Sequence, residues 1–278
     1  MPSYDTSGPI TAVLEFDVGE VRLTASKRGD TVVEVLPSNG ADDADVRAAQ
    51  QTEVTYADGT LSLKGPKRRS LFGRSGSIDV IIELPAGSRV RGTSPIGDYT
   101  GEGPLSECRI KTSLGDIRLD EASTVNLRTD HGRIRVDRAV GDAEIRGAGR
   151  VEIGEIVGAA TVRNGNGETE IGEITGELKA NSSNGRITVG IAHASVEAKS
   201  ANGAISVRQV ARGVIDLHTA VGDVEVGVRA STAAWLDVSC KAGTVRNALG
   251  AAEGPGASDE TVEIHARTGV GDIVIRRA

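Results

Sequence analysis

The chain has 278 residues and a formal net charge of −7; glycine occupies 36 positions, whereas Phe, Tyr and Trp occupy two, three and one. So few aromatic residues exclude a core built around large rings, which usually dominate the buried area of domains. The hydrophobic fraction of 38% and the charged fraction of 26% exclude an intrinsically disordered chain and a membrane-embedded one. Because binding to any nucleic acid depends on neutralising phosphates, the acidic balance also leads us to expect no nucleic-acid partner.

The N-terminal segment lacks the features of a secretory signal. MPSYDTSGPITAVLEF has no basic start followed by a continuous apolar stretch. No uncharged run in the chain approaches the ~18 apolar residues that a membrane helix needs. The sequence therefore predicts a cytoplasmic protein.

Residues 1–90 contain short segments in which apolar and polar residues alternate, and this pattern predicts strands. The segments are residues 10–16, 31–36, 53–56, 61–64 and 78–84. Residues 42–51 begin with acidic residues and are otherwise compatible with a short helix. We expect residues 1–90 to form a β-rich cap that continues into repeats over residues 91–278.

A basic loop lies between two of these predicted strands, at residues 64–76. It combines five cations with two large apolar side chains, namely Lys64, Lys67, Arg68, Arg69 and Arg74 with Leu71 and Phe72. This mixture is typical of a segment that docks on a partner or makes peripheral contact with a membrane surface. A flexible basic loop without a partner is the simpler interpretation.

The rest of the chain repeats a short motif, in which glycine is followed by alternating polar and aliphatic residues. The motif begins at Gly115, Gly132, Gly149, Gly167, Gly185, Gly203, Gly222 and Gly271, with weaker copies at Gly97 and Gly243. From Gly115 to Gly222 the spacing stays between 17 and 19 residues. A second segment of alternating residues precedes each glycine, so each repeat predicts two strands with one buried face each.

The apolar positions of these strands align from one repeat to the next as columns. One column contains Val125, Ala143, Ala160, Leu178, Val196, Ile215, Leu236 and Ile264, and its neighbour contains Leu127, Ile145, Val162, Ala180, Ala198, Leu217, Val238 and Ala266. A coil of about 18 residues cannot bury its inner face alone, so stacking must stabilise it. We therefore predict an all-β fold, a single-chain β-solenoid of ten coils spanning roughly 43 Å at ~4.8 Å per coil. The alternative is an antiparallel sandwich of hairpins.

If the coils stack in chain order, residues 273–278 form the open terminal strand. Arg276 and Arg277 would then discourage association at that edge, as charged residues do on other edge strands. The preceding insertion, residues 248–260, is rich in Ala, Gly and acidic residues and predicts a mobile loop.

Small polar residues three positions before most of these glycines mark a corner of the coil, and the repeat at Gly149 departs from this pattern. They are Thr112, Thr129, Asn164, Ser182, Ser200, Thr219 and Thr268, with Cys240 at the equivalent position of one repeat. Such side chains bind nearby backbone in turns. Gly-Asp pairs at Asp98, Asp116, Asp223 and Asp272 resemble calcium-binding rolls only superficially, since the nonapeptide pattern is missing. We interpret them as structural turns.

Neither the cysteines nor the histidines of the sequence suggest a bridge or a metal site. Coils stacked in chain order place Cys108 and Cys240 roughly 34 Å apart at ~4.8 Å per coil, so both should be free thiols in a reducing compartment. The four histidines occupy separate positions, and no cysteine joins them to form a metal-ligand set. We expect no metal, no cofactor and no small-molecule substrate.

The segment LPAGSRVRG at residues 84–92, followed by TSLGDIRL at residues 112–119 and SANGAISV at residues 200–207, resembles a known bacterial family. This is the β-strand-repeat family labelled "putative adhesin", a domain of unknown function. The resemblance covers nearly the whole chain. It implies a β-solenoid without assigned catalysis, and it supplies no functional residues to transfer.

One outward column of the predicted solenoid is rich in cations. Its positively charged members are Lys111, Arg128, Arg146, Arg163 and Lys199. Cations repeated at ~4.8 Å could follow an anionic polymer or an acidic partner surface. A neighbouring column contains acids such as Glu144 and Glu197, and a solvated face of mutual salt bridges is the simpler interpretation.

The sequence favours a non-enzymatic interaction scaffold that binds a protein partner or an anionic surface. The alternative is a self-assembling structural protein of cytoskeletal type, because open solenoid ends can stack. A surface adhesin or a carbohydrate-active enzyme fits less well, since sugar sites usually combine aromatic platforms with paired carboxylates. Trp235, just outside the core columns, is either an interface anchor or covered by the 248–260 segment.

Overall fold

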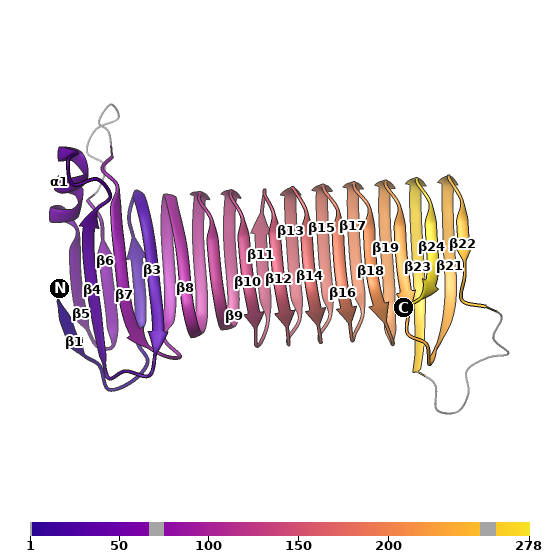
Figure 1. The fold of residues 1–278 in the computed structure, drawn as a ribbon, viewed down its shortest axis with the longest axis horizontal. Coiled ribbons are helices and arrows are strands. Elements are labelled where there is room, and N and C mark those ends of the chain that lie inside the picture. Colours follow the sequence, from indigo (N-terminus) through magenta and orange to yellow (C-terminus); the bar gives the residue numbers. More distant parts are fainter. Residues whose placement is uncertain (1, 67–74, 251–259) are drawn as a thin grey trace. The chain divides into compact units, whose positions relative to one another are not determined.

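A computed structural model describes residues 2–66, 75–250 and 260–278. The chain is a β-solenoid, with one nine-residue helix among the described residues, and it divides into two compact units, residues 1–138 (unit 1) and 139–278 (unit 2) (Figure 1). The predicted fold class is therefore confirmed, whereas a cap ending at residue 90 stays a prediction. Within the described ranges, no helix has the length and apolar character required to cross a bilayer.

Unit 1 combines parallel coils with an antiparallel edge. Its elements are β1 (Ser3–Asp5), β2 (Thr11–Glu15), β3 (Val18–Ser26), β4 (Asp30–Pro37), α1 (Asp43–Gln51), β5 (Glu53–Ala57), β6 (Thr60–Lys64), β7 (Ile78–Pro85), β8 (Arg89–Leu114), β9 (Ile117–His131) and β10 (Ile134–Ala139). The long strand β8 pairs in parallel with β2, β3 and β9. These pairings form the solenoid part of the unit.

Antiparallel strands close the N-terminal edge of unit 1. On one face β4 runs antiparallel to β7 and β1 antiparallel to β4; on the other, β5 runs antiparallel to β6. Tyr4 of β1 and Tyr56 of β5 join the two outermost strands, with ring centroids 5.2 Å apart. Because β1 and β5 run antiparallel to their neighbours, the parallel stacking of coils is not continued at this edge.

The helix expected over residues 42–51 is confirmed as α1. The carboxylate of Asp42 caps it by accepting a hydrogen bond from the backbone N–H of Ala44 at 2.8 Å. Asp43 and Asp45 lie in its first turn, where negative charge offsets the helix dipole. The helix packs on β4 and β7, with Ala48 as its buried residue.

Unit 2 consists of parallel coils, each with two main strands. Its strands are β11 (Ala143–Gly147), β12 (Val151–Ile156), β13 (Ala160–Asn166), β14 (Thr169–Ile174), β15 (Leu178–Asn184), β16 (Ile187–Ala192), β17 (Val196–Asn202), β18 (Ile205–Val210), β19 (Gly213–Val221), β20 (Val224–Val228), β21 (Thr232–Ala242), β22 (Val245–Asn247), β23 (Glu260–Val270) and β24 (Ile273–Arg277). Odd-numbered strands β11 to β19 pair successively on one face, and even-numbered strands β12 to β20 on the other.

The register of these pairs confirms the predicted columns. Ala143, Ala160, Leu178, Val196 and Ile215 are successive Cα partners, and all are buried. The antiparallel sandwich considered as an alternative is wrong for unit 2, because the coils pair in parallel. The core is a stack of aliphatic side chains between two sheets, which explains how the chain folds with so few aromatic residues.

Several corner residues bind backbone as expected, whereas the buried hydroxyl of Ser182 has no hydrogen-bond partner among the described residues. The hydroxyl groups of Thr219 and Thr268 donate to the carbonyl oxygens of Gly203 and Gly222 at 2.9 and 2.8 Å. Asn164 donates to the carbonyl oxygen of Gly149 at 2.8 Å. Each bond joins a corner to the coil that lies beside it in the stack, so the corner side chains hold adjacent coils in register.

The order of the last two coils differs from the predicted chain order. Ile215 is the Cα partner of Ile264, and Ile264 is in turn the partner of Leu236. The coil β23–β24 therefore lies between β19–β20 and β21–β22, as Figure 1 shows at the yellow end of the chain. The prediction failed because the aliphatic residues of either coil can fill the same columns.

This order corrects the proposed role of Arg276 and Arg277. Their strand β24 pairs with β20 on one side and with β22 on the other, so it is internal. Arg276 donates to Glu225 at 2.7 Å, and Arg277 donates to the carbonyl oxygens of Arg229 and Thr232 at 2.9 Å. The two arginines therefore lock adjacent coils together and do not block an edge. Within the insertion 248–260, residues 251–259 lie outside the described residues.

Candidate functional site

The predicted cationic column exists in each unit. Lys111 and Arg128 are Cα partners on β8 and β9 of unit 1. In unit 2, Arg146 and Arg163 are partners on β11 and β13, and Asn181 separates Arg163 from Lys199 on β17. The structure thus brings the predicted residues together in rows within each unit.

Acidic residues neutralise much of this column. Arg128 pairs with Asp130 at 3.1 Å, Arg146 with Glu144 at 2.7 Å, and Lys199 with Glu197 at 2.6 Å. Each pair joins residues two positions apart on one strand, where side chains lie on the same face. The hydrogen bond with Lys199 lowers the pKa of Glu197, and the same bond raises the pKa of Lys199. An anionic polymer would therefore compete with these internal carboxylates, and its binding stays a prediction.

The predicted docking loop falls mostly outside the described residues. Lys64 is the last residue of β6 and is exposed. The other six residues of the prediction, Lys67, Arg68, Arg69, Leu71, Phe72 and Arg74, lie outside the part of the chain that the structure describes. A docking role for this loop stays a prediction.

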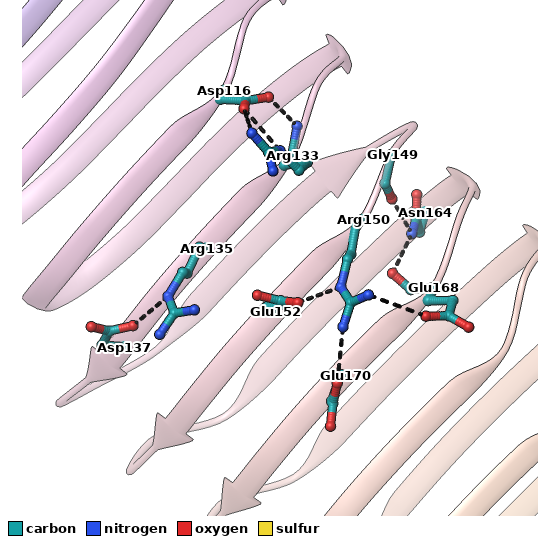
Figure 2. A network of polar contacts seen from close by, with 10 residues as sticks. All are labelled: Asp116, Arg133, Arg135, Asp137, Gly149, Arg150, Glu152, Asn164, Glu168 and Glu170. Atoms are coloured by element: carbon teal, nitrogen blue, oxygen red, sulfur yellow. Dashed lines mark hydrogen bonds and ion pairs between the residues drawn. The ribbon is translucent and has the colours of Figure 1, made fainter.

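The opposite face of unit 2 carries a charge network that sequence analysis missed. Figure 2 shows Arg150 between three carboxylates: it pairs with Glu152 of β12, the strand that begins directly after it, and with Glu168 and Glu170 of the next coil at 3.6 Å each. The register of β12 and β14 makes Glu152 the Cα partner of Glu170. Arg150 therefore separates two carboxylates that would otherwise repel each other, which is a structural role.

The Gly-Asp pairs use their carboxylates to bind backbone in an adjacent coil. Asp98 accepts from the N–H of Asp116 and Asp116 from that of Arg133, both at 2.7 Å; Asp223 accepts from the N–H of Asp272 at 2.9 Å. Burial raises the pKa of Asp116, but the hydrogen bonds and charge of Arg133, shown in Figure 2, outweigh it and lower that pKa overall. These contacts support the structural interpretation of the pairs. Within the described ranges, no group of three or more His, Cys, Asp or Glu side chains could hold a metal ion.

The coil β21–β22 (residues 232–247), here called the edge coil, is the outermost coil of unit 2. β21 pairs with β23 and β22 with β24, and no strand within the described ranges pairs with the other side of either. Its core-column residues are less buried than their equivalents: Leu236 and Val238 are half-buried and Val245 is 42% exposed, whereas Ile264, Ala266 and Ile273 of the adjacent coil are buried. The edge coil therefore leaves hydrogen-bonding groups and apolar surface accessible.

Polar contacts hold the edge coil to β23 and β24. Asp237 accepts hydrogen bonds from Arg267 at 3.1 Å and shares one with His265 at 3.4 Å. These bonds lower the pKa of Asp237, with the His265 bond as the larger cause. Trp235 is 57% exposed and meets the His265 ring edge-on, with centroids 5.4 Å apart. The exposed indole agrees with an interface anchor, the first of its two predicted roles.

The two cysteines are both free. Cys108 lies in the core of unit 1, where complete burial raises the pKa of its thiol to about 12. Cys240 occupies the corner position of the edge coil and is half-buried. Their different environments predict different chemical reactivity.

Comparisons with solved structures found similar chains of low sequence identity. A Bacteroides fragilis protein described as a putative adhesin is 15% identical, with 99% of this chain and 95% of that chain covered and a TM-score of 0.35. A Parabacteroides merdae protein described in the same way is 10% identical, with coverage of 98% and 94% and a TM-score of 0.38. A Parabacteroides distasonis protein described as a putative lipid binding protein is 12% identical, with coverage of 98% and 95% and a TM-score of 0.42.

A comparison with curated proteins found no match. The model of one protein family, Toastrack DUF4097, matches residues 13–254, which is most of the chain and includes parts of both units. This match agrees with the resemblance of the glycine-punctuated repeats to "putative adhesin" domains. The chain belongs to the Toastrack DUF4097 family.

Proposed function

We propose that this protein is a non-enzymatic interaction scaffold that binds a protein partner by adding a partner strand to the edge coil. The observation that carries this proposal is the one-sided pairing of β21, which bonds to β23 alone within the described ranges. A strand with one free side is a template for another chain, because its main-chain groups seek hydrogen-bond partners. Exposed Trp235 on the same strand offers an anchor of the kind that dominates protein interfaces.

The non-enzymatic part of the proposal is supported by the partners of the charged side chains. Aspartates of the Gly-Asp pairs bind backbone of adjacent coils, as Asp223 does, and Arg150 is surrounded by carboxylates. A catalytic acid or base usually has a perturbed pKa and lies where a substrate can reach it. Asp223 and Arg150 instead contact groups of adjacent coils.

Two free thiols support the cytoplasm as the compartment. Cys108 and Cys240 form no disulfide, which suits a reducing environment. Cell fractionation with an antibody against the native chain tests this, and recovery of the protein outside the cytoplasm would contradict it.

A site-specific photo-crosslinker tests the binding surface. Benzoylphenylalanine in place of Trp235 should capture a defined protein in cells, whereas the same group at Leu114, exposed on unit 1, should not. The captured protein is then purified and titrated against the wild-type chain. Trp235 is the only tryptophan of the chain, so its fluorescence reports binding at the edge coil when the partner contains no tryptophan. When the partner contains tryptophan, 5-hydroxytryptophan at position 235 can be excited selectively and gives the same readout.

The expected result is a saturable blue shift of Trp235 emission, and at least a tenfold loss of affinity when Val238→Lys places a charge in the half-buried column. Binding that Val238→Lys leaves unchanged, in a variant that still unfolds cooperatively, would contradict the edge coil as the binding surface.

A further inference from the structure

We infer that the partner strand on the edge coil is β21 of a second copy of this chain, paired antiparallel about a two-fold axis at Ser239. This inference rests on the proposed function and identifies its partner. It depends on three features of unit 2: the free side of β21, the charges along its outward face, and the apolar residues along its inward face.

The geometry of the coil allows this pairing. A two-fold axis perpendicular to the two sheets of a coil relates two copies whose β21 strands run in opposite directions. Each sheet of the first copy then continues into the same sheet of the second copy. Inward residues of β21 then remain inward in the second copy. Residues directly opposite each other in an antiparallel pair point to the same side of the sheet, so inward must meet inward and outward must meet outward. Only registers that obey this parity keep the apolar column continuous.

Charge complementarity selects one register among these. The outward side chains in the C-terminal half of β21 are Asp237, Ser239 and Lys241. With Ser239 opposite itself, Asp237 lies opposite Lys241 of the second copy, and the symmetry makes the same pair twice. The register with Asp237 opposite Asp237 of the second copy brings two carboxylates together. The register with Val238 opposite Val238 places Asp237 opposite Ser239, which carries no charge. Opposite charges at facing positions stabilise a strand pair, and like charges destabilise it.

The inward residues fit the same register. Val238 lies opposite Cys240 of the second copy, so a larger inward side chain faces a smaller one. Leu236 lies opposite Ala242, which belongs to the exposed corner row of Val270. Leu236, Val238 and Cys240 are half-buried and Ala242 is exposed in one copy. The pairing removes this apolar surface from water, which favours association.

An exposed aliphatic row runs up to the same edge. Val221 is the Cα partner of Val270, and Val270 is the partner of Ala242. Val221 and Val270 are 49% and 54% exposed, whereas the equivalent corner positions of earlier coils are occupied by Asn166, Asn184 and Asn202, whose side chains bond to one another. The polar corner thus becomes apolar over the coils next to the edge coil, which increases the apolar surface beside the free side of β21.

The N-terminal edge of unit 1 favours a closed pair over a filament. The N-terminal edge of unit 1 ends in antiparallel β1 and β5, which do not continue the parallel coils. A two-fold pair uses the edge coil of both copies and leaves no further edge coil for a third copy.

Light scattering coupled to size exclusion over a hundredfold concentration range tests the pair. The wild-type chain should pass from one copy to two, and Lys241→Asp should raise the dissociation constant at least tenfold because each Asp237 then faces an acid. Asp237→Lys should have the same effect. Lys179→Asp is the matched control, since Lys179 is an exposed outward lysine on β15, and it should leave the dissociation constant unchanged.

Mixing the two edge variants gives the decisive measurement. In a mixed pair, one copy carries acids at positions 237 and 241 and the other carries lysines at both, so the mixture should form a two-copy species with near wild-type affinity. Ser239→Cys in a Cys240→Ser background should form a disulfide between copies under mild oxidation, whereas Ser206→Cys on β18 in that background should not. A cooperative thermal unfolding transition in each variant is the control that it is folded.

A wild-type chain that stays a single copy over the whole range would overturn the inference of a second copy. If its β21 amides are also protected from hydrogen exchange, another segment of the same chain occupies the edge. If they exchange freely, capture of a different protein at Trp235 still tests the proposed function. A dimer unaffected by both charge reversals would overturn the Ser239 register, and assemblies that lengthen with concentration would overturn the closed pair.

Discussion

Asp272 accepts a hydrogen bond at 2.8 Å from the backbone N–H of Thr244, a residue that precedes it by 28 positions in the chain. The carboxylate of Asp223 makes the same bond to the N–H of Asp272. The Gly-Asp corners thus link three coils in the spatial order β20, β24, β22, which is not the order of the sequence. This relationship makes the edge coil depend on residues that follow it in the chain.

The pH dependence of the edge coil follows from these carboxylates. The bond from Thr244 lowers the pKa of Asp272 below its ordinary value of 3.8, and His265 and Arg267 lower that of Asp237. A carboxylate with a lower pKa in the folded state stabilises the fold above its unfolded pKa, and this contribution is lost as the pH falls through the folded value. We expect hydrogen exchange at β22 to quicken, relative to β16, as the pH falls below about 4.

Asp272→Asn provides the control for this pH effect. The amide oxygen still accepts the bond from Thr244 but does not titrate in this range, so the variant should lose part of the extra acid sensitivity. Equal acid sensitivity of β22 and β16 in the wild-type chain would contradict the prediction.

Paired substitutions test the coil order. Ile264 lies between Ile215 and Leu236 and has no exposed surface, so Ile264→Ala should lower the free energy of unfolding by about 3 kcal/mol. Leu236 is half-buried on the outermost coil, so Leu236→Ala should lower it by only about 1 kcal/mol. Urea unfolding measures both values. A larger loss for Leu236→Ala would instead support coils stacked in chain order.

The corner glycines test the close approach of consecutive coils. Gly185 has a φ of 146°, and a Cβ there would lie 2.0 Å from the carbonyl oxygen of Gly167. Gly185→Ala should therefore lower the free energy of unfolding by roughly 2 kcal/mol. Gly40→Ala, at a position where a Cβ meets nothing within 4 Å, is the control and should be nearly neutral in the same urea titration.

The cysteines should differ in alkylation. Cys108 is fully buried with its pKa raised to about 12, so it should not react with iodoacetamide at pH 7.5 in the folded chain, because the thiolate is the reactive form. Half-buried Cys240 should react, and more slowly at high protein concentration if the edge coils pair. Mass spectrometry of tryptic peptides measures both rates. Equal labelling of the two cysteines would show that the core of unit 1 opens readily.

The cationic column makes a separate prediction about anionic polymers. Replacing three arginines of the column with alanine, at positions 128, 146 and 163, should weaken salt-sensitive binding to polyphosphate. The affinity of such binding grows with the number of phosphates that the protein neutralises. Arg208→Ala, at an exposed position of β18 on the other face of unit 2, serves as a comparison that removes positive charge away from the column. Retention on a polyphosphate matrix that the triple substitution leaves unchanged would exclude this column.

Much of the fold could be predicted because apolar and polar residues alternate and the glycine motif recurs at an almost constant spacing. Together these two patterns align the apolar residues in columns, as stacked coils require. The order of the last coils could not, since Leu236 and Ile264 fill the same place equally well. A signal was nevertheless present: Asn247 stands where Val226 and Ile275 continue the aliphatic column, and Cys240 replaces the corner Thr. A coil with a polar residue in its core column is better suited to the outside of the stack.

Candidate surfaces were harder to predict because they depend on register between coils. The sequence predicted the column that contains Arg128, Arg146 and Lys199. In the structure each of these cations pairs with an acid two positions away, which neutralises a charge that the sequence alone suggests is available to a partner. Arg150 escaped notice because two of its three carboxylates come from the next coil. The free side of β21 was missed for the same reason, since it exists only once β23 has taken the inner place.

The intercalated last coil also constrains synthesis. When a ribosome has delivered residues 232–247, the strand that will support them, Glu260–Val270, does not yet exist outside the tunnel. Domains generally fold from the N-terminus as they are made. The pairing of β19 with β23 can form only after residues 260–270 have been made, so any earlier pairing of β21 with β19 must then be exchanged for the order that the structure has.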